Sequence, residues 1–256
     1  MERGAPRLHR DPRLHDRRLG AEGPTRIRPE RVVPLGDLAA YVEFSRALDL
    51  EVNETVRRLA AGVRMLGDPR VRDVVAGLGG VALHFVSSIQ ESAPELAAAI
   101  VAQCMKSGLP PAEKLGRDLE IPVCYEAEFA LDLEEVSKRT RLGPAEVQRL
   151  HASTEYLVLM IGFAPGHAYM GGLDPKLSVP RRANPRAVVP AGSVAIANDQ
   201  TVVYPYAISG GWSVIGRTPL RVFDARRAEP SLFGNGDRVR FRAIGKQEFV
   251  RIAANA

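Results

Sequence analysis

The stretch Tyr156–Pro175, YLVLMIGFAPGHAYMGGLDP, decides the fold of this chain. Its apolar start, from Tyr156 to Phe163, predicts a buried strand. The fourteen residues from Gly162 to Pro175 then hold four glycines and two prolines, together with a His and a Tyr. Glycine permits backbone conformations that other residues rarely adopt, and proline fixes φ. Because such a loop is costly to order, we expect it to serve a function rather than only to connect two strands.

Downstream of Tyr156, short apolar segments alternate with Gly and Pro, and no helix is predicted. The segments are 156–163, 191–197, 201–205, 212–216, 220–223, 237–244 and 248–252. This spacing predicts a closed or sandwiched β-structure.

Upstream, strand and helix patterns alternate. We predict strands over 38–44, 71–78, 81–86 and 119–125, and helices over 52–65 and 94–105. The order β-α-β-β-α-β is the ferredoxin-like arrangement. Residues 106–118 are predicted to link the domains. Two short helices follow, one with a capping box at Asp132–Glu135 and one that begins at Pro144.

The fold class is therefore α+β, with three predicted segments. Residues 1–28 are a basic, disordered extension, residues 29–112 a ferredoxin-like domain, and residues 119–256 a β-barrel domain. The extension holds eight arginines against four acids, and it accounts for most of the net charge of +5. A basic arm for nucleic acid is the alternative, but the extension has no aromatic residues to stack on bases.

The apolar runs and the cysteine content of the sequence are typical of a soluble cytoplasmic protein. No apolar run approaches the 18 residues of a transmembrane helix, and no secretory signal is visible. Two cysteines, Cys104 and Cys124, are expected to be buried thiols, and no metal site is expected in this chain.

Several chemical motifs are absent from the sequence. It has no P-loop, no HExxH pair and no nucleophile elbow around Ser193. The remaining candidates lie on Gly- and Pro-rich loops. His167 follows a strand and can carry a proton or a hydrogen bond near neutral pH. Arg217, like Arg181, Arg182 and Arg186, is suited to binding a carboxylate or phosphate.

The motifs in order are Gly162–Pro175, Pro180–Arg182, Val189–Val194, Gln200–Thr201, Tyr204–Pro205 and Ser209–Leu220. This series resembles the family of 5-oxoprolinase B subunits (PxpB), which also includes sporulation-kinase inhibitors and proteins named allophanate hydrolase subunit 1. It is similar, too, to the carboxyltransferase region of urea carboxylase. The resemblance implies that the C-terminal barrel is cyclophilin-like.

The resemblance implies a set of site residues as well. His151 matches a family His, whereas His167 replaces a residue that is usually Phe. Catalytic candidates are His167, His151 and Arg217. Candidates for substrate binding are Phe163, Pro165, Gly166, Tyr169, Gly192, Ser193, Gln200, Tyr204, Gly211 and Trp212. His151 can instead tie its helix to the barrel, and Trp212 can instead pack against it.

By resemblance, the chain is expected to be one subunit of an ATP-dependent 5-oxoprolinase that converts 5-oxo-L-proline to L-glutamate. The expected partners are C-like and A-like 5-oxoprolinase subunits, and the ATP site is expected to be unconventional or shared with them. Two alternatives stay open: a binding module that inhibits a histidine kinase, and a carboxyltransferase-like subunit that acts in urea metabolism.

Overall fold

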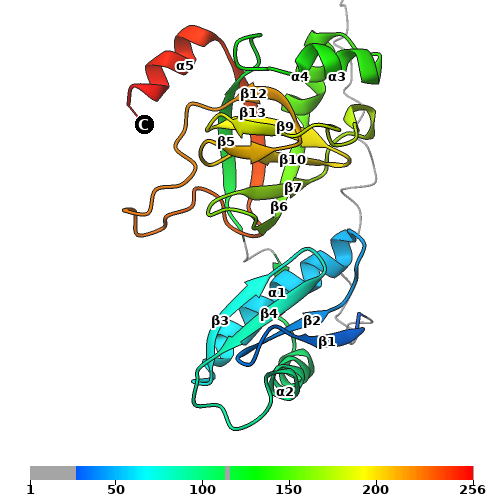
Figure 1. The fold of residues 1–256 in the computed structure, drawn as a ribbon, viewed down its shortest axis with the longest axis vertical. Helices are drawn as coiled ribbons and strands as arrows, with labels where there is room; N and C mark the ends of the chain where they lie inside the picture. The colour runs from blue at the N-terminus through cyan, green and yellow to red at the C-terminus, as the bar shows by residue number, and fades with distance from the viewer. Residues whose placement is uncertain (1–26, 113–115, 256) are drawn as a thin grey trace, which may run out of the picture.

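The computed structural model describes residues 27–112 and 116–255. They form two units, a four-stranded sheet with two helices and a closed barrel (Figure 1). The predicted extension lies outside the described residues except at its end, where Ile27 packs against the core of the first unit.

The N-terminal unit is a sheet with the strand order β1-β2-β4-β3, antiparallel throughout. Its elements are β1 (Arg31–Pro34), β2 (Ala39–Glu43), α1 (Leu50–Leu66), β3 (Val71–Ala76), β4 (Gly80–Phe85) and α2 (Ala93–Ser107). α1 begins at Asp49, whose carboxylate accepts hydrogen bonds from the backbone N–H groups of Glu51 and Val52. Both helices contribute to one hydrophobic core on one side of the sheet.

The predicted ferredoxin-like order is wrong in its last strand. The segment predicted as 119–125 forms β5 (Asp118–Cys124), which belongs to the barrel. The fourth strand of the first sheet is instead β1, which pairs with β2 as a hairpin. The pattern of β5 could not reveal this, because an apolar strand fits the core of either unit.

The barrel closes in the order β10-β7-β6-β13-β5-β12-β9. Its strands after β5 are β6 (Glu155–Ile161), β7 (Ala168–Gly171), β9 (Ser193–Ala197), β10 (Gln200–Val203), β12 (Ser213–Arg217) and β13 (Arg238–Ile244). β5 and β13 are parallel, and the other neighbours are antiparallel. The predicted closed β-structure is confirmed, and its assignment to the cyclophilin-like type stays a prediction.

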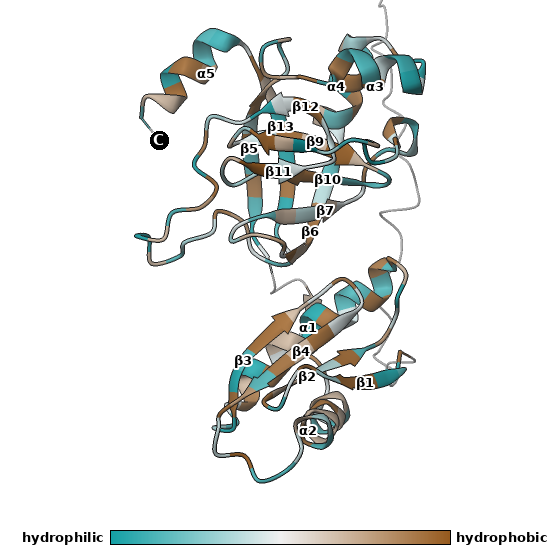
Figure 2. Cartoon of the chain, viewed as in Figure 1, coloured by the Kyte–Doolittle hydropathy of each residue, from teal (hydrophilic) through white to brown (hydrophobic). Residues whose placement is uncertain are grey.

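Short elements surround the barrel. They are α3 (Leu133–Thr140), α4 (Pro144–Ser153), the 3₁₀ turn η2 (Pro175–Leu177), the paired strands β8 (Arg186–Val189) and β11 (Ile208–Gly210), and α5 (Lys246–Ala253). Figure 2 shows hydrophobic stretches on β9 and β10 and a hydrophilic surface on α3.

Two predictions for the barrel region are wrong. Residues 248–252 lie in α5 rather than in a strand, because Phe249 and Ile252 pack three residues apart against Phe129 and Cys124. The segment 220–223 forms no strand beyond a single bridge between Phe223 and Ser231.

The two units meet at α1. The Asn53 side chain is fully buried, and its amide donates to Leu159 O of β6 at 3.2 Å and to Leu78 O at 3.0 Å. One side chain therefore ties the first unit to the barrel. Within the described residues, every helix is too short or too polar to cross a bilayer.

Candidate functional site

The candidate residues gather on the outer face of four barrel strands, β7, β10, β9 and β12. Side chains alternate along each strand, so Met170, Val203 and Val194 fill the barrel interior. Their neighbours Tyr169 and Tyr204 point outward, into a second cluster that β8 covers. That cluster contains Val189, Ala195, Ala197, Val202, Tyr204, Trp212 and Val214, with Tyr169 packed against it.

The loop between β6 and β7 shapes the edge of this face. His167 N donates to Ala164 O at 3.0 Å, which closes a turn with Pro165 and Gly166 at its centre. Gly166 has φ of +77°, as the third residue of a type II turn requires. A side chain there would also strike Phe223, since an added Cβ would lie 2.9 Å from Phe223 Cβ. The turn therefore carries His167 into the cluster.

His167 is buried among aromatic rings. Its ring centroid lies 4.9 Å from that of Tyr169, 5.1 Å from that of Tyr204 and 5.4 Å from that of Phe163. Burial lowers the pKa of His167 to about 4, so the imidazole is neutral at pH 7. Its Nδ1 is buried without a hydrogen-bond partner in the structure. The ring can thus offer a hydrogen bond to a ligand, whereas it is a poor cation.

Two further polar atoms on this side of the barrel lack partners. Gln200 Nε2, at the far end of β10, and Arg182 Nε, in the loop before β8, are both buried without a hydrogen bond. Arg182 N also donates to Gly211 O at 2.7 Å, which places this loop beside Trp212. Buried polar groups are usually hydrogen-bonded, so unpaired ones are expected where a ligand or water completes the network.

Tyr169, Tyr204 and Trp212 form the wall of the face. The Tyr169 and Trp212 rings meet edge to face at 5.9 Å, and the guanidinium of Arg181 lies 5.6 Å from the Trp212 ring centroid. Burial raises the pKa of Tyr204 to about 12, so its hydroxyl stays protonated. The Trp212 side chain is almost fully buried. It packs against the barrel and is not free to stack on a ligand.

Phe163 has a different environment. It is a non-glycine residue with φ of +70°, and its side chain is 66% exposed. A bulky residue in the left-handed region is strained, and such strain often marks a functional site. Pro165, two residues on, is exposed as well.

Arg217 lies in a separate cleft of about 640 Å³ at the same end of the barrel. The cleft runs between α5 and the segment that follows β12, and its walls include Gly192, Tyr206, Phe223 and Phe249. Arg217 Nε donates to Ala191 O at 2.7 Å. Among the described residues, no carboxylate pairs with its terminal nitrogens. A guanidinium held in this way can bind an anionic group in the cleft.

Gly192 and Ser193 connect the cleft to the aromatic face. Gly192 N donates to Tyr204 O at 2.8 Å, and Tyr204 N donates to Ser193 O at 2.9 Å. A side chain at Gly192 would collide with the carbonyl of Thr218, so this position needs glycine. Phe223 contacts Gly166 and also lines the cleft. The two groups of candidates therefore adjoin each other.

The structure places His151, a predicted catalytic residue, away from the other candidates, and its catalytic role stays a prediction. Its ring is fully buried in the barrel interior, where Nδ1 lies 2.7 Å from Tyr125 Oη and Nε2 lies 3.0 Å from Thr201 Oγ1. It also stacks on Phe241 at 4.7 Å. Burial lowers its pKa to about 3. His151 therefore ties α4 to the barrel, which was the alternative.

The environment of Arg182 and Arg186, in and after the loop before β8, also differs from the prediction. Asp132 is 3% exposed, and its carboxylate accepts from Arg182 at 2.6 Å and from both terminal nitrogens of Arg186. It accepts from Val214 N at 2.7 Å as well, so Asp132 occupies the predicted N-cap position of α3 but its side chain makes no capping hydrogen bond. The predicted capping box is thus wrong for Asp132. The terminal nitrogens of Arg182 and Arg186 are held by this carboxylate, and only Nε of Arg182 stays unpaired.

Several residues of the site had no signal in the sequence. Tyr206, Arg221 and Phe223 line the Arg217 cleft. Arg221 and Phe223 fall in the segment 220–223, which the pattern marked only as part of the β-structure, and Tyr206 follows the Tyr204–Pro205 motif without belonging to it.

Comparisons with known proteins agree with this architecture. The family described as "Carboxyltransferase domain, subdomain C and D" matches residues 30–233. The chain is 35% identical to the 5-oxoprolinase B subunit of Bacillus subtilis, over 86% of this chain and 95% of that protein. It is 37% identical to the protein of the same name from Escherichia coli O157:H7, over 81% of this chain and 93% of that protein.

A solved structure, that of TTHA0988, shares 32% identity and a TM-score of 0.69 over 81% of this chain. The chain spans only 40% of the length of that structure's chain. A fold of this kind is therefore joined to further polypeptide in TTHA0988.

Proposed function

Because the chain belongs to the family of 5-oxoprolinase B subunits, of the carboxyltransferase subdomain C and D type, we propose that it works within an ATP-dependent 5-oxoprolinase. The near full-length match to two B subunits carries this proposal. The complex would open the lactam of 5-oxo-L-proline with water and release L-glutamate. In this reaction the γ-phosphoryl group of ATP passes to the lactam oxygen and ADP leaves. Water then adds to the activated carbon, the C–N bond breaks and phosphate departs.

The barrel end supplies groups that suit such a substrate. 5-Oxoproline has one carboxylate and one cyclic amide. Arg217 lines a cleft with mixed polar and apolar walls, where a carboxylate can accept a charge-assisted hydrogen bond from its terminal nitrogens. His167 is neutral at pH 7 and lies buried in the aromatic cluster beside this cleft, so its Nδ1 is not required to contact the amide.

Partner subunits belong to the proposal because the chain lacks standard catalytic groups. Its sequence has no P-loop and no nucleophile elbow. Arg217 is a cation in the cleft that can contact a phosphate, whereas Arg221 pairs with Asp224 at 3.1 Å, so a complete nucleotide site needs groups from elsewhere. The C-like and A-like subunits would provide them.

The test is reconstitution. The purified chain, mixed with 5-oxoproline and ATP, is expected to release no glutamate alone and to do so when both partner subunits are added. Glutamate release by the isolated chain would contradict the need for partners. The carboxyltransferase alternative, which the family description keeps open, predicts a different result. The full mixture would then release no glutamate, and a parallel assay would show biotin-dependent carboxylation of urea.

The kinase-inhibitor alternative is tested separately. The purified chain is added to an autophosphorylating histidine kinase at equimolar concentration. Inhibition there, with no effect of the chain on oxoproline turnover by the other subunits, would replace the enzymatic proposal with a binding role.

A further inference from the structure

The contact between the two units contains a buried charge, the guanidinium of Arg57 in α1. The Arg57 side chain is 7% exposed, and its Nε donates to Asn53 Oδ1 at 3.0 Å. Asn53 lies one helical turn earlier on the same face of α1, and its amide donates to Leu159 O of β6. Arg57 is therefore held where α1 meets the barrel.

Arg57 has no acidic partner among residues 27–112 and 116–255. Beyond the bond from Nε, its guanidinium makes no hydrogen bond or ion pair with them. The neighbouring acid Glu54 pairs with Arg58 instead, at 3.7 Å. An unpaired charge inside a protein is costly, so buried charges are normally paired. The terminal nitrogens of Arg57 therefore retain the capacity to bind an anion.

A second guanidinium approaches the same place from the barrel. Arg238 begins β13 and lies opposite Leu157 in the register of β13 and β6, two residues from Leu159. Its ion pair with Asp118 is long, at 3.9 Å, and the Asp118 side chain is 84% exposed. Burial lowers the pKa of Arg57 and Glu54 opposes this, while the positive charge of Arg238 lowers it further. Arg57 and Arg238 are thus close enough to repel each other.

The turn before β13 adjoins this contact and holds an unpaired polar atom. Asn235 Oδ1 is buried without a hydrogen-bond partner among the described residues. The next residue, Gly236, donates from its backbone N to Val158 O at 2.8 Å, so the turn lies beside β6. The terminal nitrogens of Arg57, unlike Asn235 Oδ1, keep some contact with solvent. A small solute can therefore reach them.

The ligand that suits two converging guanidinium groups is a small oxyanion. Each guanidinium can donate two parallel hydrogen bonds to the oxygens of a phosphate or a carboxylate. A phosphate ion has enough oxygens to accept from both groups at once, whereas a single carboxylate has only two. The small exposed fraction of Arg57 also favours the free ion over a nucleotide.

We propose that the contact between α1 and β13 is a phosphate-binding site, in which Arg57 and Arg238 hold one inorganic phosphate from the two units. This inference goes beyond the proposed function and does not depend on it. The bound anion would compensate the buried guanidinium and bridge the N-terminal unit to the barrel.

Isothermal titration calorimetry of the full chain with inorganic phosphate tests the site, in a chloride background of constant ionic strength. We expect one phosphate to bind per chain. Arg57→Gln and Arg238→Gln should each raise the Kd by roughly ten- to a hundredfold, because each removes charge-assisted hydrogen bonds. Acetate and AMP serve as probes for a lone carboxylate and for a nucleotide phosphate, and both should bind more weakly than phosphate.

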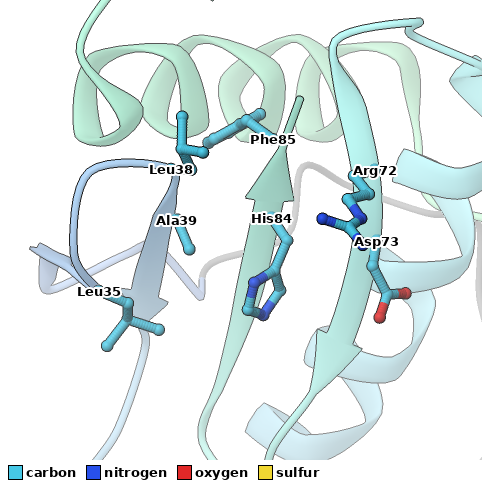
Figure 3. Close-up of a pocket in the computed structure, with 7 residues that line it drawn as sticks. All are labelled: Leu35, Leu38, Ala39, Arg72, Asp73, His84 and Phe85. Carbon is cyan, nitrogen blue, oxygen red and sulfur yellow. The ribbon is translucent and has the colours of Figure 1, made fainter. Parts of the chain in front are cut away.

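The matched control is Arg72→Gln, which removes one positive charge from the same unit. Figure 3 shows Arg72 with Asp73 and His84 around a cavity of about 370 Å³ on the sheet. Arg72 lies near the start of β3, whereas Asn53 contacts Gly77 O, beyond the end of that strand. The control should therefore keep the phosphate Kd of wild type within about twofold, since only general charge effects remain.

Thermal unfolding gives a second measurement. If the Kd is near 1 mM, about 20 mM phosphate should raise the melting temperature of wild type by about 4–7 °C. The same shift is expected for Arg72→Gln, and a shift below about 1 °C for Arg57→Gln. Without phosphate, Arg57→Gln should melt no lower than wild type, because it removes an unpaired buried charge while its amide can still donate to Asn53.

Three results would overturn the inference. The first is a wild-type chain that binds no phosphate, and the second is an Arg57→Gln variant that binds phosphate as tightly as wild type. The third is tighter binding of acetate or AMP than of phosphate, which would assign the two guanidinium groups to a different ligand. None of these results bears on the oxoprolinase assay, so the proposed function stands or falls separately.

Discussion

Arg217 and His167 adjoin each other at one end of the barrel, but their chemistry differs. Arg217 offers a permanent charge to an open cleft, whereas His167 offers a neutral ring to a buried cluster. We therefore expect substitution of these two side chains to change turnover by different amounts.

Arg217→Ala should impair turnover more than His167→Phe. Loss of a charge-assisted hydrogen bond to a bound anion costs about 1.5–3 kcal/mol, or roughly ten- to more than a hundredfold in affinity. His167→Phe keeps an aromatic ring and removes an unpaired buried nitrogen, so we expect turnover within about threefold of wild type. Turnover of the reconstituted complex measures both, with melting curves as the folding control. Near-normal turnover by Arg217→Ala beside an inactive His167→Phe would reverse the ranking and make Nδ1 a ligand contact.

His151 should make the fold sensitive to acid. Its folded pKa of about 3 lies below the ordinary value of 6.5, so protons bind the unfolded chain first. The contribution of neutral His151 to the unfolding free energy is complete above pH 6.5 and is lost as the pH falls toward 3. The slope approaches about 1.4 kcal/mol per pH unit, or roughly 2 kcal/mol between pH 7 and 5. His167, with its pKa of about 4, contributes in the same sense.

Urea unfolding between pH 7 and 5 tests this contribution. His151→Gln should be less stable than wild type at pH 7, because it loses the Tyr125 and Thr201 contacts. Its unfolding free energy should then fall less steeply as the pH decreases. The slope should be smaller than that of wild type by up to about 1.4 kcal/mol per pH unit. An unchanged slope would mean that His151 is protonated in the folded protein.

Among the elements, the loop before β8 is held in place by Asp132. This one buried carboxylate accepts from Arg182, Arg186 and the backbone of Val214. Asp132→Ala should lower the unfolding free energy by about 3 kcal/mol, since it leaves two partly buried guanidinium groups and the Val214 N–H without their buried partner. Glu135→Ala removes an exposed partner of Arg182 and should cost about 1 kcal/mol or less. Equal losses in urea unfolding would contradict this hierarchy.

The same residues show what sequence patterns can predict. The closed barrel followed from the spacing of apolar segments, and the strands predicted over 71–78 and 81–86 were confirmed as the antiparallel pair β3 and β4. Asp132 fitted a capping box by spacing alone, but tertiary contacts engaged its carboxylate instead. α5 was missed because Phe249, Val250 and Ile252 suit a strand as well as a helix when the window is short.

The site was predictable to a similar degree. Glycine- and proline-rich motifs marked His167, Tyr204 and Arg217 as candidates, and the structure places all three at one end of the barrel, but their roles stay predictions. Which of them share a cluster depends on the strand register, since a shift of one residue exchanges the two faces of a strand. Register is not visible in one sequence. The burial of His151 depends instead on which face of α4 packs on the barrel, the face it shares with Val147 and Leu150.

At the scale of the whole molecule, Asn53 couples the two units. Its buried amide donates to Leu78 O within the N-terminal unit and to Leu159 O of the barrel. Asn53→Leu should leave buried carbonyl groups unpaired and cost about 1–3 kcal/mol. Because the Leu159 contact crosses between the units, we expect calorimetry to show two thermal transitions in this variant and one in wild type.

Asp49→Ala is the control for Asn53→Leu. It removes the N-cap of the same helix, at a typical cost of about 1 kcal/mol, and it touches only α1. The control should lower the melting temperature without splitting the transition, because the Asn53–Leu159 hydrogen bond is intact. If Asn53→Leu also unfolds in one transition, coupling must run through other contacts, such as those of Arg57, which is 7% exposed and donates to Asn53 Oδ1 at 3.0 Å. Two transitions already present in wild type would show instead that the units unfold independently and that Asn53 only orients them.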